Sequence, residues 1–315
     1  MAPSPVLSIV IVNWNTRELL LAILRRLFDA PALPCEVIVV DNHSSDDSVA
    51  AARAAFPQAI VLPQSKNGGF AYGVNRGLEA SHGRWILLLN SDAEASWSEL
   101  ERLIAAAERE PGVAVFGARI TDENGSPQRS SWPAHRPAHY LPQALFLDRL
   151  RAKTPPAAAT DVDAVSGCVF LIRASVLPAL GGFDERFFMY FEEADFCERV
   201  RRAGHRVRWL PDATFVHVGG LSAGQSAERT FVAFRESALL YHAQWHGRFS
   251  TEYVRACLVL GLLLRLLAWS VPALLGRRNR VRLYAKALRV LARPGYVGEL
   301  CRRPREVPAI PPPIT

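Results

Sequence analysis

Short apolar runs alternate with amphipathic stretches over residues 6–120. The apolar runs suit strands that are buried on both faces, and they lie at 6–13, 35–41, 59–65, 84–92 and 113–120. The stretches between them have helical spacing, and they lie at 16–29, 44–56, 70–81 and 96–110. Thr16 is a candidate N-cap for the first helix. This βαβα order predicts an α/β domain with a mostly parallel, Rossmann-like central sheet that is covered by helices on both faces.

The pattern weakens over residues 121–160, which are rich in Pro, Ser, His and Ala and predict a loop-rich insert. Regular patterning then resumes with a strand at 164–173 and a short helix at 174–183. A further helix ends at Ala203, because Gly204 is a typical residue just past a helix C-terminus. A strand and turn follow at 205–220, and the strand ends at His217.

Residues 254–276 are almost continuously apolar and are interrupted by Arg265 and Pro272. Their length just reaches that of a membrane-spanning helix, but a central arginine is costly in hydrocarbon. A span, a helix lying in the membrane interface and a buried helix therefore all stay open. The basic run at 277–289 favours contact with an anionic cytoplasmic leaflet.

Length and composition bear on the number of domains, the compartment and the partners of the protein. The chain has 315 residues, half of them hydrophobic, which is enough for one large domain or a domain with an appendage. We expect one large domain at residues 1–250, which includes the insert at 121–160, and a hydrophobic and basic helical region at 251–315. The five cysteines are scattered and odd in number, which favours a reducing compartment, and residues 1–12 lack the basic start of a signal peptide. The net charge of +7 is concentrated near the C-terminus without a nucleic-acid-binding motif, so no nucleic-acid partner is expected.

Polar residues follow several of the predicted strands, at the edge where open parallel sheets bind their ligands. They are Asn13, Asp41, Asn90, Ser91, Asp92, Glu94 and His217. The first turn lacks GxGxxG, and no phosphate-binding GxxxxGK[ST] loop is present, so a metal is the expected partner of any phosphate. Asp92, Glu94 and His217 suit Mg²⁺ or Mn²⁺. Taken singly, Asp92 also suits a turn or helix cap, and His217 a structural histidine.

Six stretches in a fixed order resemble family 2 glycosyltransferases with a GT-A fold, in particular the rhamnosyltransferase-like branch. They are "SIVIVNWN", "VIVVDNHSSDDS", "NGGFAYGVNRGLEASHGRWILLLNSDAE", "SGCVFLIR", "GGFDERFFMYFEEADFCERVRRAGHRV" and "PDATFVHVGGLS", within residues 7–245. The resemblance implies a donor site formed by Asn13, Asp41, Asn67, Gly69, Asn75, Asn90, Ser91 and Asp92.

Individual roles follow from the same resemblance. Asp41 would contact the donor nucleoside, although it also suits capping the helix of residues 46–56. Asp92 matches the last acid of the family's DxD-like metal motif, with Asn90 in place of the first Asp as a mild departure. His217 would complete the metal site, and Glu94 would assist it.

The resemblance also explains the acids after the aromatic run of residues 187–191. Glu192 and Glu193 occupy the first turn of a predicted helix, where the helix dipole alone would favour them. Relatives usually have Glu-Asp here, and the second acid resembles the general base. That role would fall to Glu193, or to Glu192 if the register is shifted. Asp195 would orient neighbours through Arg199, and Phe187 and Phe191 suit core packing.

The resemblance implies an inverting, metal-dependent transferase that acts at the cytoplasmic face of a bacterial membrane. The donor would be dTDP-rhamnose, and the acceptor a lipid-linked or cell-envelope glycan. Residues 1–250 would form the catalytic domain, with the insert at 121–160 on its acceptor side. Alternatives are a transferase that uses a UDP-hexose, UDP-galactofuranose or a GDP-sugar, and a non-catalytic GT-A module that binds sugar nucleotides. The Asn90 and Glu193 departures favour the non-catalytic module, whereas Asp92 and His217 favour the enzyme. A nucleotidyltransferase is disfavoured because "NWNTRE" is not a Gly-rich basic loop.

Overall fold

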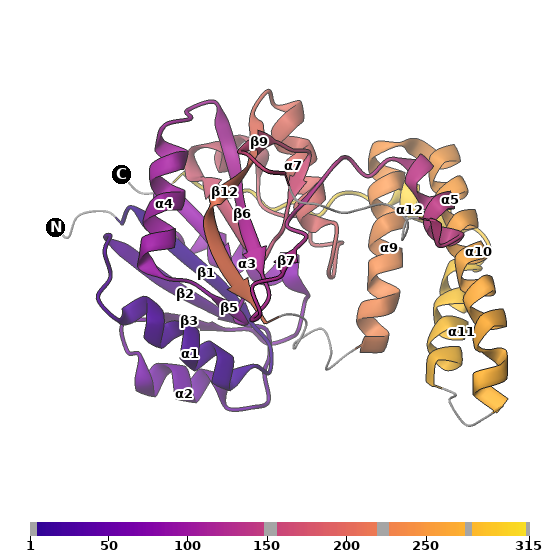
Figure 1. The fold of residues 1–315 in the computed structure, drawn as a ribbon, viewed down its shortest axis with the longest axis horizontal. Coiled ribbons are helices and arrows are strands. Elements are labelled where there is room, and N and C mark those ends of the chain that lie inside the picture. The colour runs from indigo at the N-terminus through magenta and orange to yellow at the C-terminus, as the bar shows by residue number, and fades with distance from the viewer. Residues whose placement is uncertain (1–4, 148–155, 219–226, 275–278, 313–315) are drawn as a thin grey trace.

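The computed structural model describes residues 5–147, 156–218, 227–274 and 279–312. An α/β domain carries the N-terminal part of the chain, and a layer of C-terminal helices lies beside it (Figure 1). The described residues form a sheet of ten strands with the main order β3-β2-β1-β4-β11-β6-β12-β5. The longer strands are β1 (Leu7–Asn13), β2 (Cys35–Asp41), β3 (Ile60–Pro63), β4 (Trp85–Leu89), β6 (Val113–Thr121), β11 (Val169–Arg173) and β12 (Arg206–His217).

Most of the main strands run in one direction, as the sequence predicts. β2 and β4 flank β1 in parallel, β3 continues beside β2, and β12 is parallel to β6. β11 is the exception, because it runs antiparallel to both β4 and β6. The strand expected at 164–173 is divided. β10 (Ala164–Val165) leaves the main sheet to pair with β8 (Ser131–Trp132), and β11 follows. Short antiparallel strands complete the edges: β5 (Ala93–Glu94), β7 (Pro127–Gln128) and β9 (Thr160–Asp161).

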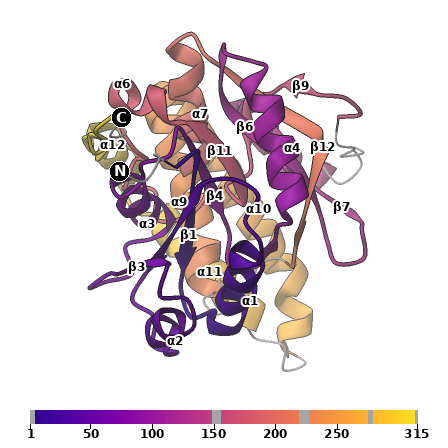
Figure 2. The same ribbon diagram turned by 90° about the vertical axis from the view of Figure 1, so that its left-hand side faces the viewer.

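Helices cover both faces of the sheet because alternate strand residues point in opposite directions. Ile9 and Ile11 belong to the core beneath α1 (Arg17–Phe28), α2 (Ser48–Ala55) and α4 (Trp97–Glu108). Val10 points into the opposite core, with α3 (Phe70–Glu79) and α7 (Glu192–Arg202). Figure 2 shows α1 and α4 on the near side of the sheet and the C-terminal helices on the far side. The predicted helix positions are confirmed to within a few residues.

The predicted insert contains short elements rather than bare loop. Besides β7, β8 and β9, it forms a 3-10 turn (Pro137–His139) and α5 (Tyr140–Ala144). Tyr140 and Ala144 are buried against the helical layer. Residues 148–155 of this insert lie outside the described part of the chain. A second short helix, α6 (Leu177–Leu180), follows β11.

The C-terminal layer begins before residue 251. It consists of α9 (Ala227–Trp245), α10 (Gly247–Leu274), α11 (Asn279–Leu291) and α12 (Tyr296–Arg302). Its buried residues Val254 and Leu262 join the same hydrophobic core as Phe196 and Val200 of α7, so helical layer and α/β domain pack as one body. The domain boundary at residue 250 stays a prediction. Within the described residues, one helix segment, Gly247–Ser270, is long and apolar enough to cross a membrane.

The end of the chain returns to the α/β domain. The Gly182 N–H donates to Pro308 O at 2.8 Å, and the Glu185 N–H donates to Glu306 O at 2.9 Å. Arg186 Nη1 donates to Arg303 O at 2.6 Å. Residues 303–310, the C-terminal strap, therefore hold the loop that precedes α7.

Candidate active site

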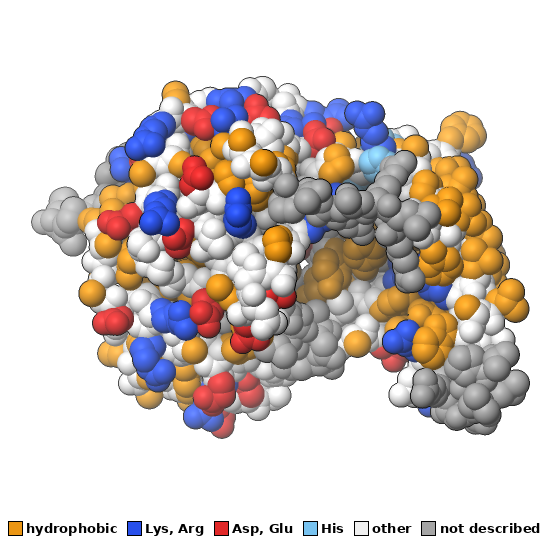
Figure 3. Space-filling model, in the orientation of Figure 1, with side chains coloured by type: hydrophobic (Ala, Val, Ile, Leu, Met, Phe, Trp, Pro, Cys, Tyr) orange, Lys and Arg blue, Asp and Glu red, His pale blue; other side chains and the backbone are white. Residues whose placement is uncertain are grey.

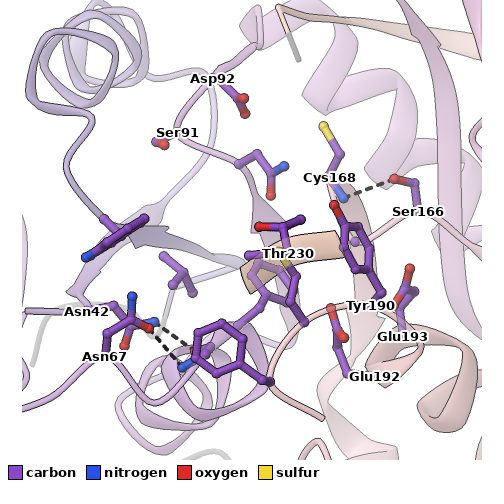
Figure 4. Close-up of a pocket in the computed structure, with 18 of the residues that line it drawn as sticks. Asn42, Asn67, Ser91, Asp92, Ser166, Cys168, Tyr190, Glu192, Glu193 and Thr230 are labelled. Atoms are coloured by element: carbon purple, nitrogen blue, oxygen red, sulfur yellow. Dashed lines mark hydrogen bonds between the residues drawn. The ribbon is translucent and has the colours of Figure 1, made fainter. Parts of the chain in front are cut away.

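A cavity of about 300 Å³ opens at the carboxyl ends of β1 and β4, where the N-terminus of α7 faces it. Figure 4 shows Ser91 and Asp92 on one side of this cavity and Glu192 and Glu193 on another. A cavity of this size suits a small polar molecule rather than a protein surface. Its lining includes Trp14, Asn42, Asn67, Gly69, Asn90, Ser91, Asp92, Ser166, Cys168, Phe188, Tyr190, Glu192, Glu193, His217, Arg229 and Thr230.

The turn before α3 is locked against the loop before α7. The Gly69 N–H donates to Asn67 Oδ1 at 3.0 Å, and Asn42 Nδ2 donates to Gly69 O at 2.8 Å. The Phe70 N–H donates to Phe188 O at 2.8 Å. Gly69 has φ +95°, and a Cβ there would lie 2.2 Å from Phe188 O. The position therefore requires glycine, for its backbone conformation and for the close approach.

A chain of hydrogen bonds between buried polar side chains lies beneath the cavity. Asn13 Nδ2 donates to Asp41 Oδ1 at 2.8 Å, and the Thr16 hydroxyl donates to Asn13 Oδ1 at 2.7 Å. The Thr16 and Ser91 hydroxyls are 2.9 Å apart. Thr16 lies at the N-cap position of α1, as predicted, but its side chain makes no capping hydrogen bond, because its hydroxyl takes part in this network. Asp41 also accepts from the Ser44 N–H at 2.9 Å, ahead of α2, and therefore does not cap that helix.

Asn75 is a correction to the predicted donor site. Its amide exchanges two hydrogen bonds with the backbone of Phe183, at 2.9 and 2.7 Å. Its Nδ2 also donates to Glu185 at 2.9 Å. Asn75 is fully buried and is not among the cavity-lining residues. Its observed role is to fasten α3 to the loop that precedes α7.

Two of the three predicted metal ligands meet. His217 Nε2 lies 3.2 Å from Asp92 Oδ1, and Asn90 Nδ2 lies 3.5 Å from the same nitrogen. Gln128 holds the ring, because its Nε2 donates to His217 O at 2.7 Å and its Oε1 lies 3.0 Å from Nδ1. With the amide oxygen placed to accept a proton from Nδ1, Nε2 would be free to bind a cation shared with Asp92.

Glu94 does not join this pair. In the antiparallel β5–β12 pairing, Ala93 lies opposite His217 and Glu94 lies opposite Val216. Opposed residues share a face of the sheet, so Glu94 points away from His217 and forms an ion pair with Arg26 at 3.0 Å. The predicted third ligand is therefore a correction, and no cluster of three His, Cys, Asp or Glu side chains able to hold a metal occurs among the described residues. Asp92 and His217 still fit Mg²⁺ or Mn²⁺, since Mg²⁺ sites commonly use few protein ligands and complete the shell with phosphate and water.

The two glutamates enter the cavity at the first turn of α7. Tyr190 and Phe191 precede them with φ of +70° and +67°, a left-handed conformation that is costly for non-glycine residues and is concentrated at functional sites. One carboxylate oxygen each of Glu192 and Glu193 is buried without a hydrogen-bond partner. Burial raises the pKa of Glu193 to about 7. Burial, and next the neighbouring Glu193 charge, raise the pKa of Glu192 well above its usual range.

Asp195 has the orienting role that the sequence predicts. Arg199 Nε donates to its Oδ2 at 2.9 Å, and Arg199 also reaches the carbonyls of Leu180 and Gly182. Gln244 and Trp245 of α9 donate to the other oxygen of Asp195. This carboxylate accepts three hydrogen bonds from the protein and joins α7 to α9.

The aromatic residues before α7 lie in two environments. Phe187 and Phe191 are buried in the core, as expected. Phe188 and Tyr190 line the cavity, and the Arg229 guanidinium lies over the Phe188 ring at 3.7 Å from its centroid. Arg229, Asn42 and Gln128 were not identified from the sequence. Asn42 directly follows a named strand end, whereas Arg229 and Gln128 had no local signal.

A family model for glycosyl transferase family 2 matches residues 8–179, more than half of the chain. The chain belongs to glycosyl transferase family 2. The matched region contains the Asp41, Asn67–Gly69 and Asp92 segments described above, and the glutamates and His217 lie beyond it. Family membership identifies the protein as a glycosyltransferase, as the sequence resemblance implied.

Relatives and solved structures agree with this assignment. The chain is 28% identical over 267 residues to the N-acetylglucosaminyl-diphospho-decaprenol L-rhamnosyltransferase of Mycobacterium tuberculosis, covering 77% of this chain and 85% of the relative. It is 28% identical to the low-salt glycan biosynthesis hexosyltransferase of Haloferax volcanii, covering 62% of each. A mannosyltransferase from Pyrobaculum calidifontis, solved with GDP-Man and Mn²⁺, matches the fold with a TM-score of 0.55 at 17% identity, over 95% of this chain and 88% of that structure. The expected GT-A fold is confirmed.

Proposed function

We propose that this glycosyltransferase moves rhamnose from dTDP-rhamnose to a lipid-linked or cell-envelope polysaccharide acceptor, with inversion of the anomeric centre. The relative from Mycobacterium tuberculosis supports the sugar and the acceptor class, because the alignment covers 85% of its length. The observation that carries the reaction class is the cavity itself, which places an Asp92–His217 pair and two unpaired, buried glutamates around one space.

The donor would lie along the Asp92 side of the cavity. Asn67, Gly69, Asn90 and Ser91 line that space and are proposed to contact it. Asp41 and Asn13 lie beneath the lining and are proposed to act through the buried chain that ends at Ser91.

Asp92 and His217 would hold Mg²⁺ or Mn²⁺ on the donor diphosphate. When bound, the ion would stabilise the negative charge that develops on the leaving diphosphate. Arg229, which also lines the cavity and lies over Phe188, would add a positive charge.

Glu193 is the proposed base. With a pKa near 7 it is partly ionised at neutral pH, and a base of this strength suits removal of a hydroxyl proton in the transition state. As the proton passes to Glu193, the acceptor oxygen bonds to the anomeric carbon. The bond to the diphosphate oxygen breaks, and its electron pair leaves with the nucleoside diphosphate. Glu192 is the alternative base, and the burial that raises its pKa favours its protonated form.

The C-terminal helices are proposed to hold the enzyme at the cytoplasmic face of the membrane, where a lipid-linked acceptor would be presented. The apolar segment of α10 and the arginine-rich residues after it support this location.

Release of nucleoside diphosphate tests the proposal. The purified protein is incubated with dTDP-rhamnose, UDP-glucose, UDP-galactose, UDP-GlcNAc or GDP-mannose, with Mn²⁺ or with EDTA. We expect metal-dependent turnover of dTDP-rhamnose that is lost in Asp92→Ala and kept in the control Glu94→Gln. Turnover of another donor instead would show that the transferred sugar is not rhamnose. Donor binding without turnover in the presence of acceptor would favour a non-catalytic binding module.

A further inference from the structure

The outer face of α10 is a continuous apolar stripe. Its exposed side chains recur every three or four residues, which is the spacing of one helix face. Three of them are among the most exposed large apolar side chains described: Phe249 is 93% exposed, Leu267 72% and Leu263 48%. The full stripe consists of Phe249, Tyr253, Ala256, Leu260, Leu263 and Leu267. It extends over about 27 Å at 1.5 Å per residue, and no charged residue interrupts it.

Three leucines in and just after helix α5 widen this apolar surface. Leu141, Leu145 and Leu147 are 39–50% exposed. The helix packs directly on α10, since a Cβ on Gly261 would lie 3.2 Å from Ala144 Cα. Figure 3 shows hydrophobic side chains gathered on the flank formed by these two helices. An exposed apolar area of this extent indicates a docking surface.

Other sides of α10 pack against neighbouring helices. α11 lies antiparallel along it, because Arg280 stacks on Trp269 at 4.3 Å near one end and Arg255 Nη1 donates to Leu291 O at 3.2 Å near the other. α11 carries exposed charges along this length, namely Arg282, Lys286 and Arg289. If α10 crossed a bilayer in this packing, those charges would enter hydrocarbon with it.

The C-terminal part of the chain is also strongly basic. Residues 247–315 contain thirteen Lys and Arg residues against three Glu, whereas the chain as a whole has a net charge of only +7. An apolar helix face in a part of the chain with a strong excess of positive charge matches an anionic lipid surface, where the acyl boundary takes the apolar side chains and the headgroups take the cations.

We propose that α10 binds lengthwise to an anionic bilayer surface through this stripe together with Leu141, Leu145 and Leu147, and does not span it. The inference deepens the proposed membrane location and rests on it, but it does not depend on the sugar or the acceptor. The bound enzyme would be a peripheral protein with α9, α11 and the α/β domain outside the hydrocarbon.

Vesicle co-flotation tests the surface. We expect binding to vesicles of phosphatidylcholine mixed with phosphatidylglycerol, and weak binding to phosphatidylcholine alone. The variant Leu263→Glu/Leu267→Glu should weaken binding by about tenfold or more. The control Ala50→Glu/Ala54→Glu adds the same charge on exposed positions of α2 and should bind like the native protein. Equal binding by both variants, or a dimer in light scattering with no vesicle binding, would overturn the proposal.

Depth measurements separate lying from spanning. A fluorophore is attached at Phe249→Cys or Leu267→Cys in a Cys35→Ser/Cys301→Ser background and quenched by lipids brominated at different depths. Lengthwise binding predicts the same shallow depth at both ends of the stripe, and different depths would indicate a span. Donor hydrolysis in solution is measured on the same variants. Loss of hydrolysis with normal vesicle binding would contradict the proposed function alone, and the reverse would contradict this inference alone.

Discussion

At the scale of single residues, the site is a contrast between satisfied and unsatisfied carboxylates. Both carboxylate oxygens of Asp195, and both of Asp41, accept hydrogen bonds from the protein. Glu192 and Glu193 each keep a buried oxygen without a partner. Since leaving a buried acceptor unpaired costs free energy, such groups are expected where a substrate supplies the missing partner.

The Glu193 carboxylate should determine the pH profile. Because its pKa is raised to about 7, the ionised form gains population as pH rises through 7, and kcat/KM should rise with it and then level off. Glu193→Gln should lower kcat by about 10²–10⁴-fold and remove this limb of the profile. If Glu192→Gln removes the limb instead and Glu193→Gln retains it, Glu192 is the base.

Gln128 should influence metal affinity without touching the metal. Its amide holds the His217 ring so that Nε2 would be free to bind a cation. Gln128→Ala should weaken Mn²⁺ binding about 10–100-fold, as loss of a ligand's supporting hydrogen bond does in metal sites. Calorimetric Mn²⁺ titration with donor present measures this, and exposed Gln58→Ala is the control. Unchanged Mn²⁺ affinity would show that Gln128 is not needed to orient the His217 ring.

At the scale of elements, the site depends on how the loops before α3 and α7 fit together. The Asn75 side chain and the Phe70 N–H both bind backbone of the 183–188 segment, and that segment leads to the two left-handed residues, Tyr190 and Phe191, that precede the glutamates. The donor side and the base side are therefore positioned together by these contacts.

Substitution of Gly69 tests this coupling. Gly69→Ala should lower kcat/KM by at least about tenfold, because the new Cβ would collide with Phe188 O and displace the loop. Gly125→Ala is the matched control, since Gly125 also has a positive φ, +78°, but a Cβ there would have no described atom within 4 Å. Equal effects of the two variants would indicate backbone strain alone.

The contact between α9 and the insert should weaken at acid pH. His242 is fully buried with both ring nitrogens unpaired, and burial, then His246 and His135, lower its pKa to about 3. The unfolded chain takes up this proton near pH 6.5, so the free energy of unfolding should fall as pH drops from about 6.5 towards 3. Urea unfolding of His242→Phe should show a shallower fall, whereas His205→Phe should not.

At the scale of the whole molecule, the C-terminal strap closes the structure. Ile310 is 3% exposed and belongs to the core that contains Phe196 and Val254. Through Pro308 and Glu306 the strap holds the loop that leads to the glutamates. The helical layer is thus attached to the α/β domain at both its beginning and its end.

Ile310→Ala should therefore lower the free energy of unfolding by about 2–4 kcal/mol, the usual cost of a cavity in a core. Urea denaturation in the absence of lipid measures it. Leu147→Ala, which removes an exposed leucine, should change stability by less than about 0.5 kcal/mol. A similarly small effect of Ile310→Ala would mean that the strap is not part of the cooperative core.

The sequence by itself determined the elements and the reaction class. Apolar runs and helical spacing are local, so strands such as Cys35–Asp41 and helices such as Trp97–Glu108 were predictable, and Asp92, Glu193 and His217 lay in recognisable stretches. Only the tertiary structure decided which side chains meet. Strand pairing directs Glu94 away from His217. Contact between the loops before α3 and α7 buries Asn75, which binds backbone there, and β12 places His217 beside Gln128. α10 likewise acquired an inner and an outer face only through packing against α11 and α5. Side-chain direction depends on partners that are distant in sequence, and local patterns do not carry that information.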